Sequence, residues 1–191
     1  MLYLARGGDI VAERAYKYRI YPNKKQQELI RKTFGCTRYV YNYYLDKRKT
    51  DKTNYTYVKC AKDLTQLKKE LEWLKEVDSV GLQTSLKDLD VAYKNFFSGR
   101  SGYPKFKSRK NRHQSYRTSF TNNNIAFMDK HIKLPKLGLV KVRDKQVPQG
   151  RILNATISQE PDGRFYCSLC CTDVSFVQLS KTNQFVGIDL G

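Results

Sequence analysis

Residues 15–23 read Ala-Tyr-Lys-Tyr-Arg-Ile-Tyr-Pro-Asn, and this stretch decides how the fold begins. Apolar or aromatic side chains alternate with basic ones as far as Tyr21, which is the period-two pattern of a strand with one buried face. Pro22 ends the strand, and Asn23 with Gln26 three residues later forms a variant of the capping box at a helix N-terminus. The sequence therefore predicts a strand over 15–21 that is followed at once by a helix.

The helix after this strand is predicted to bury one broad face. Gly35 is its weak point, because glycine costs about 1 kcal/mol relative to alanine inside a helix. Two interpretations follow: one long helix that tolerates the glycine, or a helix-turn-helix in which Gly35 forms the turn and residues 38–49 form the recognition helix. We favour the single helix because Cys36 and Thr37 add no further helix breaker. The buried face is formed by Leu29, Ile30, Phe34, Tyr41 and Leu45.

Two more amphipathic helices are predicted over 57–74 and 82–97, where apolar residues recur at intervals of three and four. After Phe97 the pattern changes to short alternating runs that are separated by prolines and turn residues, which is typical of strands. The order of one strand, several helices and many strands predicts an α+β fold, a small β-barrel with a helical insertion after its first strand. The later strands are predicted at 115–120, 125–127, 131–134, 139–142, 152–159, 164–172 and 185–190.

The composition points to a folded protein that binds polyanions. The chain has 191 residues, which is enough for one ordinary domain or two small ones. Its 36 basic and 18 acidic residues leave a net charge of +18, so nucleic acid is the first partner to consider. A hydrophobic fraction of 40% excludes a disordered basic tail. The sequence has no apolar run of the roughly 20 residues that a membrane span needs, and its five cysteines are typical of free thiols in a cytoplasmic protein.

Residues 94–151 carry most of the excess charge. This segment contains 15 Lys and Arg residues against two acids, Asp129 and Asp144, so it holds +13 of the total of +18. Aromatic residues lie between the cations, a mixture in which bases can stack while neighbouring charges neutralise the phosphates. The alternative is a generically basic surface without a specific partner. The nucleic-acid-binding residues predicted from this segment are Arg100, Tyr103, Lys105, Phe106, Lys107, Arg109, Lys110, Arg112, Tyr116, Arg117 and Lys136.

Signals for catalysis or metal binding are weak in most of the chain. Cys167 and Cys170 have zinc-like spacing, but a second pair is missing and the two residues face opposite ways in a strand. His113 and His131 have no cysteine or carboxylate cluster beside them in the sequence, so we expect surface histidines. Asp189 is the one candidate, because a carboxylate near the end of an apolar strand suits an oxygen ligand for Mg²⁺. The alternative for this residue is the cap of a turn.

Seven segments in this order resemble the N-terminal half of the TnpB (OrfB) family, the RNA-guided DNA endonucleases of insertion sequences that are also described as transposases. The resemblance covers almost everything from Ala15 onward, and seven motifs in order are more specific than any one of them. The matching segments are 15–23, 38–42, 82–97, 103–107, 115–118, 134–138 and 186–191.

The resemblance implies a domain organisation. Residues 15–22 and 99–180 would form a wedge-type β-barrel, and residues 23–98 would form an inserted helical recognition lobe. Residues 181–191 would begin a RuvC nuclease domain of the RNase H type. Residues 1–14 lie upstream of the usual family start, and we expect a flexible extension or an artefact of the chosen translation start.

The resemblance also implies partners and site residues. A guide RNA and double-stranded target DNA would bind this region, whereas no membrane and no small-molecule substrate is implied. Tyr57, Gln83, Thr121 and Asn124 would read a short DNA motif beside the target. Gln83 suits this role because an amide can bond adenine bidentately, while Tyr57 and Thr121 are equally suited to packing or turn roles. The protein would then work in the cytoplasm of a bacterium or archaeon, associated with the nucleoid.

For catalysis, the resemblance makes Asp189 the first of three RuvC acids that hold Mg²⁺. The other two acids and the zinc ribbon of the family are absent from this sequence. We therefore expect the chain to bind no metal stably and to be inactive as a nuclease on its own. The alternative function is a DNA-binding module or repressor that needs no RNA and reads its site with a helix-turn-helix.

Overall fold

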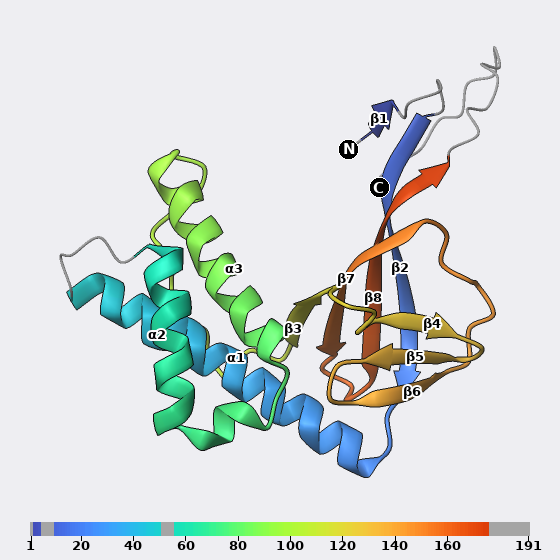
Figure 1. The fold of residues 1–191 in the computed structure, drawn as a ribbon, viewed down its shortest axis with the longest axis horizontal. Helices are drawn as coiled ribbons and strands as arrows, with labels where there is room; N and C mark the ends of the chain where they lie inside the picture. The colour runs from blue at the N-terminus through green and yellow to red at the C-terminus, as the bar shows by residue number, and fades with distance from the viewer. Residues whose placement is uncertain (1, 5–9, 51–55, 176–191) are drawn as a thin grey trace, which may run out of the picture.

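A computed structural model of the chain describes residues 2–4, 10–50 and 56–175, and it confirms the α+β class. Three α-helices gather on one side of an antiparallel sheet (Figure 1). None of the described helices is long and apolar enough to cross a membrane. The helical elements are α1 (Lys24–Thr50), α2 (Tyr57–Glu70), the short 3-10 helix η1 (Glu72–Lys75) and α3 (Ser79–Phe97). The strands are β1 (Leu2–Leu4), β2 (Ile10–Tyr21), β3 (Gln114–Ser119), β4 (Ala126–Met128), β5 (His131–Leu134), β6 (Gly138–Val142), β7 (Arg151–Gln159) and β8 (Phe165–Ser175).

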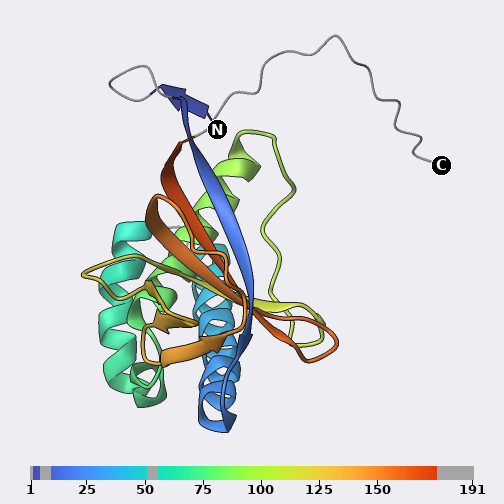
Figure 2. The ribbon, with the colours of Figure 1, turned by 90° about the vertical axis from the view of Figure 1, so that its right-hand side faces the viewer.

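The sheet is a continuous antiparallel path with β2 near its middle. Its strand order is β3-β7-β8-β2-β6-β5-β4, and β1 pairs with β2 away from this path. The long pair of β2 and β8 sets the frame, with Tyr18 opposite Cys167. Figure 2 shows the short strands β5 and β6 crossing the direction of the long strands. The pairings between described residues leave β3 and β4 at the two ends of the path, so the described part of the sheet is open and does not close as a barrel.

The start of α1 is the predicted capping box. The Gln26 amide N–H donates to Asn23 Oδ1 at 2.9 Å, and the Asn23 amide N–H donates to Gln26 Oε1 at 3.0 Å. Gln26 Nε2 also donates to the carbonyl oxygens of Leu137, in the turn between β5 and β6, and of Leu139 at the start of β6. One side chain therefore both caps the helix and fixes it to the sheet.

Helix α1 continues without a break through Gly35, which confirms the single long helix. A recognition helix separated by a turn at this glycine is not formed. No atom lies within 4 Å of the position that a Cβ of Gly35 would occupy. The glycine therefore costs about 1 kcal/mol of helix stability without a packing contact to explain it.

The helix predicted over 57–74 is divided, whereas the one over 82–97 is confirmed. Leu71 leaves the helical conformation (φ −111°, ψ 82°), and the chain then makes the separate turn η1. This break allows both Leu74 and Val77 to be fully buried. Helix α3 begins at Ser79, where Asp78 caps it by accepting hydrogen bonds from the amides of Val80 and Gly81. The Thr118 hydroxyl of β3 donates to the same carboxylate, which joins the helices to the sheet.

Two hydrophobic cores result from this arrangement. One lies between the sheet and the first half of α1, where Ile30 and Phe34 pack on strand residues, and the other lies among the helices. Leu29 packs against both.

The strands predicted between 115 and 172 are confirmed within a few residues, and the one over 185–190 lies outside the described residues. Strand β2 begins at Ile10 and so includes part of the predicted N-terminal extension. Cys167 is buried and Cys170 is partly exposed, as expected for opposite faces of β8, and all five cysteines are free thiols.

Candidate nucleic-acid interface

The predicted cationic residues lie mainly on one segment, residues 98–113, which we call the cationic loop. It leaves the end of α3 and runs back to β3 as a coil without regular structure (Figure 2). Most of the predicted cations therefore lie on a loop between α3 and β3 and not on a strand. The exposed cations of the loop are Arg100, Lys105, Lys107, Arg109, Lys110 and Arg112.

Contacts far apart in the sequence hold the cationic loop against α1. The Asn42 amide bonds the backbone of Lys107 twice, since its Nδ2 donates to the Lys107 carbonyl at 2.9 Å and its Oδ1 accepts from the Lys107 N–H at 2.8 Å. Nearer α3, the hydroxyls of Tyr93 and Tyr103 share a hydrogen bond of 2.9 Å. A loop fixed at several points along α1 presents its side chains in one arrangement, which lowers the entropy lost when a ligand binds.

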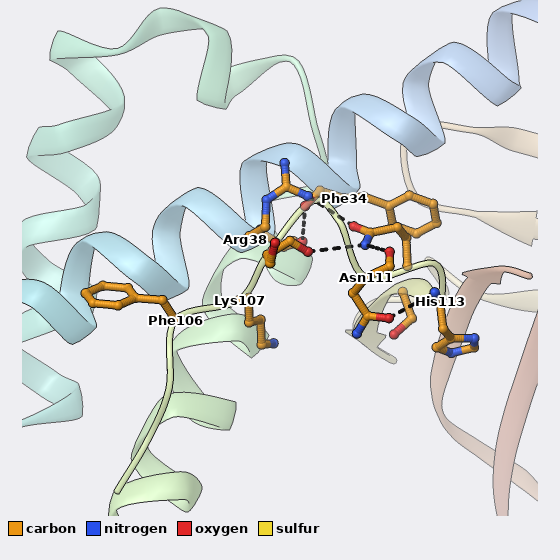
Figure 3. A pocket seen from close by; sticks show the side chains of 10 residues that line it. Phe34, Arg38, Phe106, Lys107, Asn111 and His113 are labelled. Atoms are coloured by element: carbon orange, nitrogen blue, oxygen red, sulfur yellow. Dashed lines mark hydrogen bonds between the residues drawn. The ribbon is translucent and has the colours of Figure 1, made fainter. Parts of the chain in front are cut away.

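A groove lies where the cationic loop passes α1 and enters β3. It has a volume of about 450 Å³, and Arg38 forms part of its wall, where Nη1 donates to Gln114 Oε1 at 3.0 Å (Figure 3). A second cavity of about 230 Å³ shares Thr37, Lys107 and Ser115 with the groove and extends it toward α3. The groove is lined by Phe34, Thr37, Arg38, Phe106, Lys107, Ser108, Asn111, His113, Gln114 and Ser115.

Lys107 lines both the groove and the second cavity, although part of its side chain is exposed. Its Nζ lies 4.3 Å from the ring centre of Tyr41, a cation–π contact. Desolvation lowers the pKa of Lys107 below its usual value; Asp88 opposes this shift and Arg117 adds to it. An anion such as a phosphate would offset the desolvation of Lys107, because it gives the ammonium group a partner of opposite charge.

Aromatic rings beside the loop are exposed in a way that permits stacking. Tyr103 and Phe106 are 39% and 49% exposed, and Lys49 Nζ lies 5.6 Å and 4.6 Å from their ring centres. Phe97, at the end of α3, is 79% exposed. Tyr116 differs, because its ring is buried against Phe34 in the core of the sheet. Its placement in the structure is that of a packing residue.

The cations of the loop have no acidic partners in the described part of the chain. None of the six has a carboxylate oxygen within 4 Å there, whereas Arg117 is paired with Asp88 across the end of the groove. The helices differ, because Lys32, Lys47, Arg48, Lys75 and Lys94 each contact a carboxylate. Unpaired surface cations attract phosphates more strongly than paired ones, because no protein carboxylate has to be displaced.

The predicted motif readers lie on three separate elements. Gln83 is exposed on α3, and Tyr57 is partly buried at the start of α2, where it packs against the core of the helices. Asn124 closes a turn with Thr121, since its Oδ1 accepts from the Thr121 N–H at 2.7 Å and its Nδ2 donates to the Ser119 carbonyl. Lys136 is exposed in the turn between β5 and β6. None of these residues lines the groove, and Asp189 lies outside the described residues.

The described residues offer no metal site. No group of three or more His, Cys, Asp or Glu side chains lies together in this part of the chain. His113 Nδ1 contacts Glu160 at 3.2 Å, and His131 Nδ1 lies 2.9 Å from the Asp129 carbonyl. Mg²⁺ needs several oxygen ligands in octahedral geometry, so no metal-dependent step is assigned to this region.

Three residues of the interface were missed by reasoning from the sequence. Asn42 fixes the loop, Lys49 contacts its rings, and Arg38 lines the groove, whereas the sequence placed all three only in the alternative recognition helix over 38–49. Arg38, Asn42 and Lys49 recur at intervals of four and seven along α1, so the helical period was the signal that could have placed them on one side.

Comparisons with known proteins identify a family at the N-terminal part of the chain. Residues 12–52 match a family described as a helix-turn-helix domain, that of OrfB proteins of IS605-type elements. These residues form most of β2 and the single helix α1 in the structure, so the name does not describe their local geometry.

Curated relatives extend the match over nearly the whole chain. The chain is 36% identical to the "Putative RNA-guided DNA endonuclease" of Streptomyces pristinaespiralis over 94% of its own length and 46% of that protein. It is 32% identical to the "Putative RNA-guided DNA endonuclease InsQ" of Escherichia coli (strain K12), over 93% of its length and 45% of that protein. It is also 35% identical to "Virulence protein VsdF" of Salmonella dublin, over 50% of its length and 87% of that protein. The chain thus spans about half the length of the first two relatives.

Proposed function

Because the chain belongs to the TnpB (OrfB) family, we propose that it is the nucleic-acid-binding portion of an RNA-guided DNA endonuclease, which holds guide RNA and target-adjacent DNA. The observation that carries this proposal is the cationic loop, whose six exposed cations have no acidic partner among the described residues. It lies beside a groove and exposed rings, which together suit a sugar-phosphate strand with unpaired bases.

The chemistry of binding follows from the side chains. Phosphate oxygens accept hydrogen bonds from the guanidinium and ammonium groups of the loop, and each contact releases counterions from the nucleic acid. Lys107 lines both the groove and the second cavity, and it binds a phosphate at the centre of the proposed site. Tyr103 and Phe106 stack with bases beside it.

Several finer assignments follow from the family and belong to the same proposal. Residues 15–22 and 99–180 act as the wedge domain, in which the described strands form an open sheet at the place of the expected barrel. Residues 23–98 act as the recognition lobe. Tyr57, Gln83, Thr121 and Asn124 read the target-adjacent DNA motif. Asp189 is the first RuvC acid, a ligand for Mg²⁺ in the complete nuclease.

Binding to a structured RNA at increasing salt tests the proposal. We expect tight binding at about 50 mM NaCl and a log–log slope of roughly −0.7 to −0.9 for each phosphate contact, so that six contacts give a slope of about −4 to −5. Binding that is absent at low salt, or that does not change with salt, would contradict the proposal.

A second candidate function is favoured by the match to a helix-turn-helix family at residues 12–52. In this alternative the chain reads a DNA site without RNA. Footprinting of the element's end DNA in the absence of RNA separates the two functions, because an RNA-guided protein leaves no sequence-specific footprint without its guide.

A further inference from the structure

A third cavity lies on α1 beside the groove. Its volume is about 420 Å³, and we call it the aromatic cavity. Tyr39 and Trp73 meet edge to face with ring centres 5.0 Å apart, and they are 36% and 37% exposed. Tyr43 stacks on Tyr39 at 5.9 Å. The cavity is lined by Gly35, Arg38, Tyr39, Asn42, Tyr43 and Trp73.

Gly35 keeps this cavity open. Four other described glycines also have no atom within 4 Å of the position that a Cβ would occupy, but each has another reason to be glycine. The backbone has a positive φ at Gly99, Gly138 and Gly163, and Gly102 lies in the cationic loop. Gly35 has neither reason, since it lies inside a helix with ordinary helical geometry. A glycine that weakens a helix and makes no packing contact indicates that a bound ligand occupies the space beside it.

The chemistry of the lining favours a flat, anionic ligand. The six lining residues include ring faces and the guanidinium of Arg38 but no carboxylate. Arg38 also lines the groove, so the two cavities meet at this side chain. The Asn42 amide is occupied by the backbone of Lys107, which leaves ring faces and the guanidinium as the recognition elements.

We propose that the aromatic cavity binds an unpaired nucleobase of a single strand whose phosphates lie in the groove. This inference rests on the proposed function and adds a specific site to it. The base stacks on one of the two nearly perpendicular rings, Tyr39 or Trp73, and meets the other at its edge, and Arg38 contacts the phosphate that lies between the aromatic cavity and the groove.

The fluorescence of Trp73 tests the proposal, because Trp73 is the only tryptophan of the sequence. The probe is an oligoadenylate RNA of about 12 nucleotides, and its control is an abasic strand of the same length and charge. We expect saturable quenching by the oligoadenylate, whereas the abasic strand binds through its phosphates without quenching. Equal fluorescence and equal affinity with both strands would overturn this site while leaving the proposed function intact. Binding of neither strand would overturn both.

Filling the cavity provides an independent test. Gly35→Leu places a side chain in open space, so we expect the variant to fold and to melt no lower than the wild type. Its affinity for the oligoadenylate should fall about tenfold, and its affinity for the abasic strand should not change. An oligoadenylate affinity equal to that of the wild type would overturn the proposal. Tyr39→Ala removes one stacking face without filling the cavity, and it should weaken the same strand selectively.

Discussion

The helices and the cationic loop carry the same kinds of basic side chain but differ in how those charges are balanced. Among the helices, five cations contact a carboxylate, as in the pair of Lys47 with Asp63 at 2.9 Å. In the loop, the exposed cations have no such partner in the described part of the chain, although the loop is fixed to α1 by Asn42. The distribution of acidic partners therefore distinguishes the loop from the helices, which net charge alone does not.

The largest expected effect comes from removing unpaired charges. The triple variant Lys105→Ala, Arg109→Ala, Lys110→Ala should bind structured RNA about 100-fold more weakly at about 0.1 M salt, and its salt dependence should be flatter by about two to three in slope. Filter binding over a salt series measures both quantities.

The matched control for this variant removes the same charge from exposed lysines that contact a carboxylate. Lys32→Ala, Lys75→Ala, Lys94→Ala should lose only a few-fold in affinity, because a paired cation attracts phosphates less strongly. Equal losses in the two triple variants would show that the local balance of charge does not decide where RNA binds.

The next effect is expected on the free energy of unfolding, at Asp78, which forms no ion pair with a described residue. Asp78 is buried, caps α3 and accepts a hydrogen bond from Thr118. Asp78→Ala should cost about 2 kcal/mol in the free energy of unfolding, because the cap and the link to β3 are both lost. Urea denaturation measures this cost. Asp78→Asn keeps an acceptor at the cap and should cost clearly less, and an equal cost would assign the effect to charge instead of capping.

A smaller effect on affinity is expected from an exposed ring of the loop. Phe106→Ala should weaken RNA binding about five- to tenfold without changing the melting temperature, because the ring is half exposed and is available for stacking. Val58, 59% exposed on α2, provides the control, since Val58→Ala should leave binding unchanged. A drop in melting temperature for Phe106→Ala would indicate a packing role.

The smallest effect concerns Glu160, which pairs with His113 at the end of the loop and with Lys17. Hydrogen bonding from His113 lowers the pKa of Glu160 below its usual value, and Lys17 acts in the same direction. A carboxylate with a lowered folded-state pKa adds stability above its unfolded pKa and loses it as the pH falls through the folded pKa. Melting temperatures of the wild type and of Glu160→Gln should therefore converge between about pH 6 and pH 3. A constant difference across this range would rule out the ion pairs as its cause.

Local patterns in the sequence predicted most of the elements. The capping box of Asn23 and Gln26 and the strand over 131–134 follow from interactions between near neighbours, so they are visible in a short window. The break at Leu71 was missed because it is set by the burial of Leu74 and Val77, which depends on tertiary packing.

The interface was predicted only in part, for a related reason. The residues of the loop were identified by composition, but its course along α1 depends on bonds between Asn42 and Lys107, which are 65 positions apart. The sequence pattern did not identify Trp73 as a site residue, because it lies beside the apolar stripe of Leu71 and Leu74 and not within it. Burial of Tyr116 could not be told from exposure, since aromatic residues in a strand suit either face.

The anchoring of α1 through Gln26 has a mechanical consequence. The helix is fixed to the turn between β5 and β6 at its first residues, and its 27 residues extend for about 40 Å beyond that joint. Ile30 and Phe34 also pack on strand residues, and Asn42 holds the cationic loop farther along the helix. Helix α1 is thus a rigid connection between the sheet and the loop, so a displacement of the sheet would be transmitted to the loop and to the rings that Lys49 contacts.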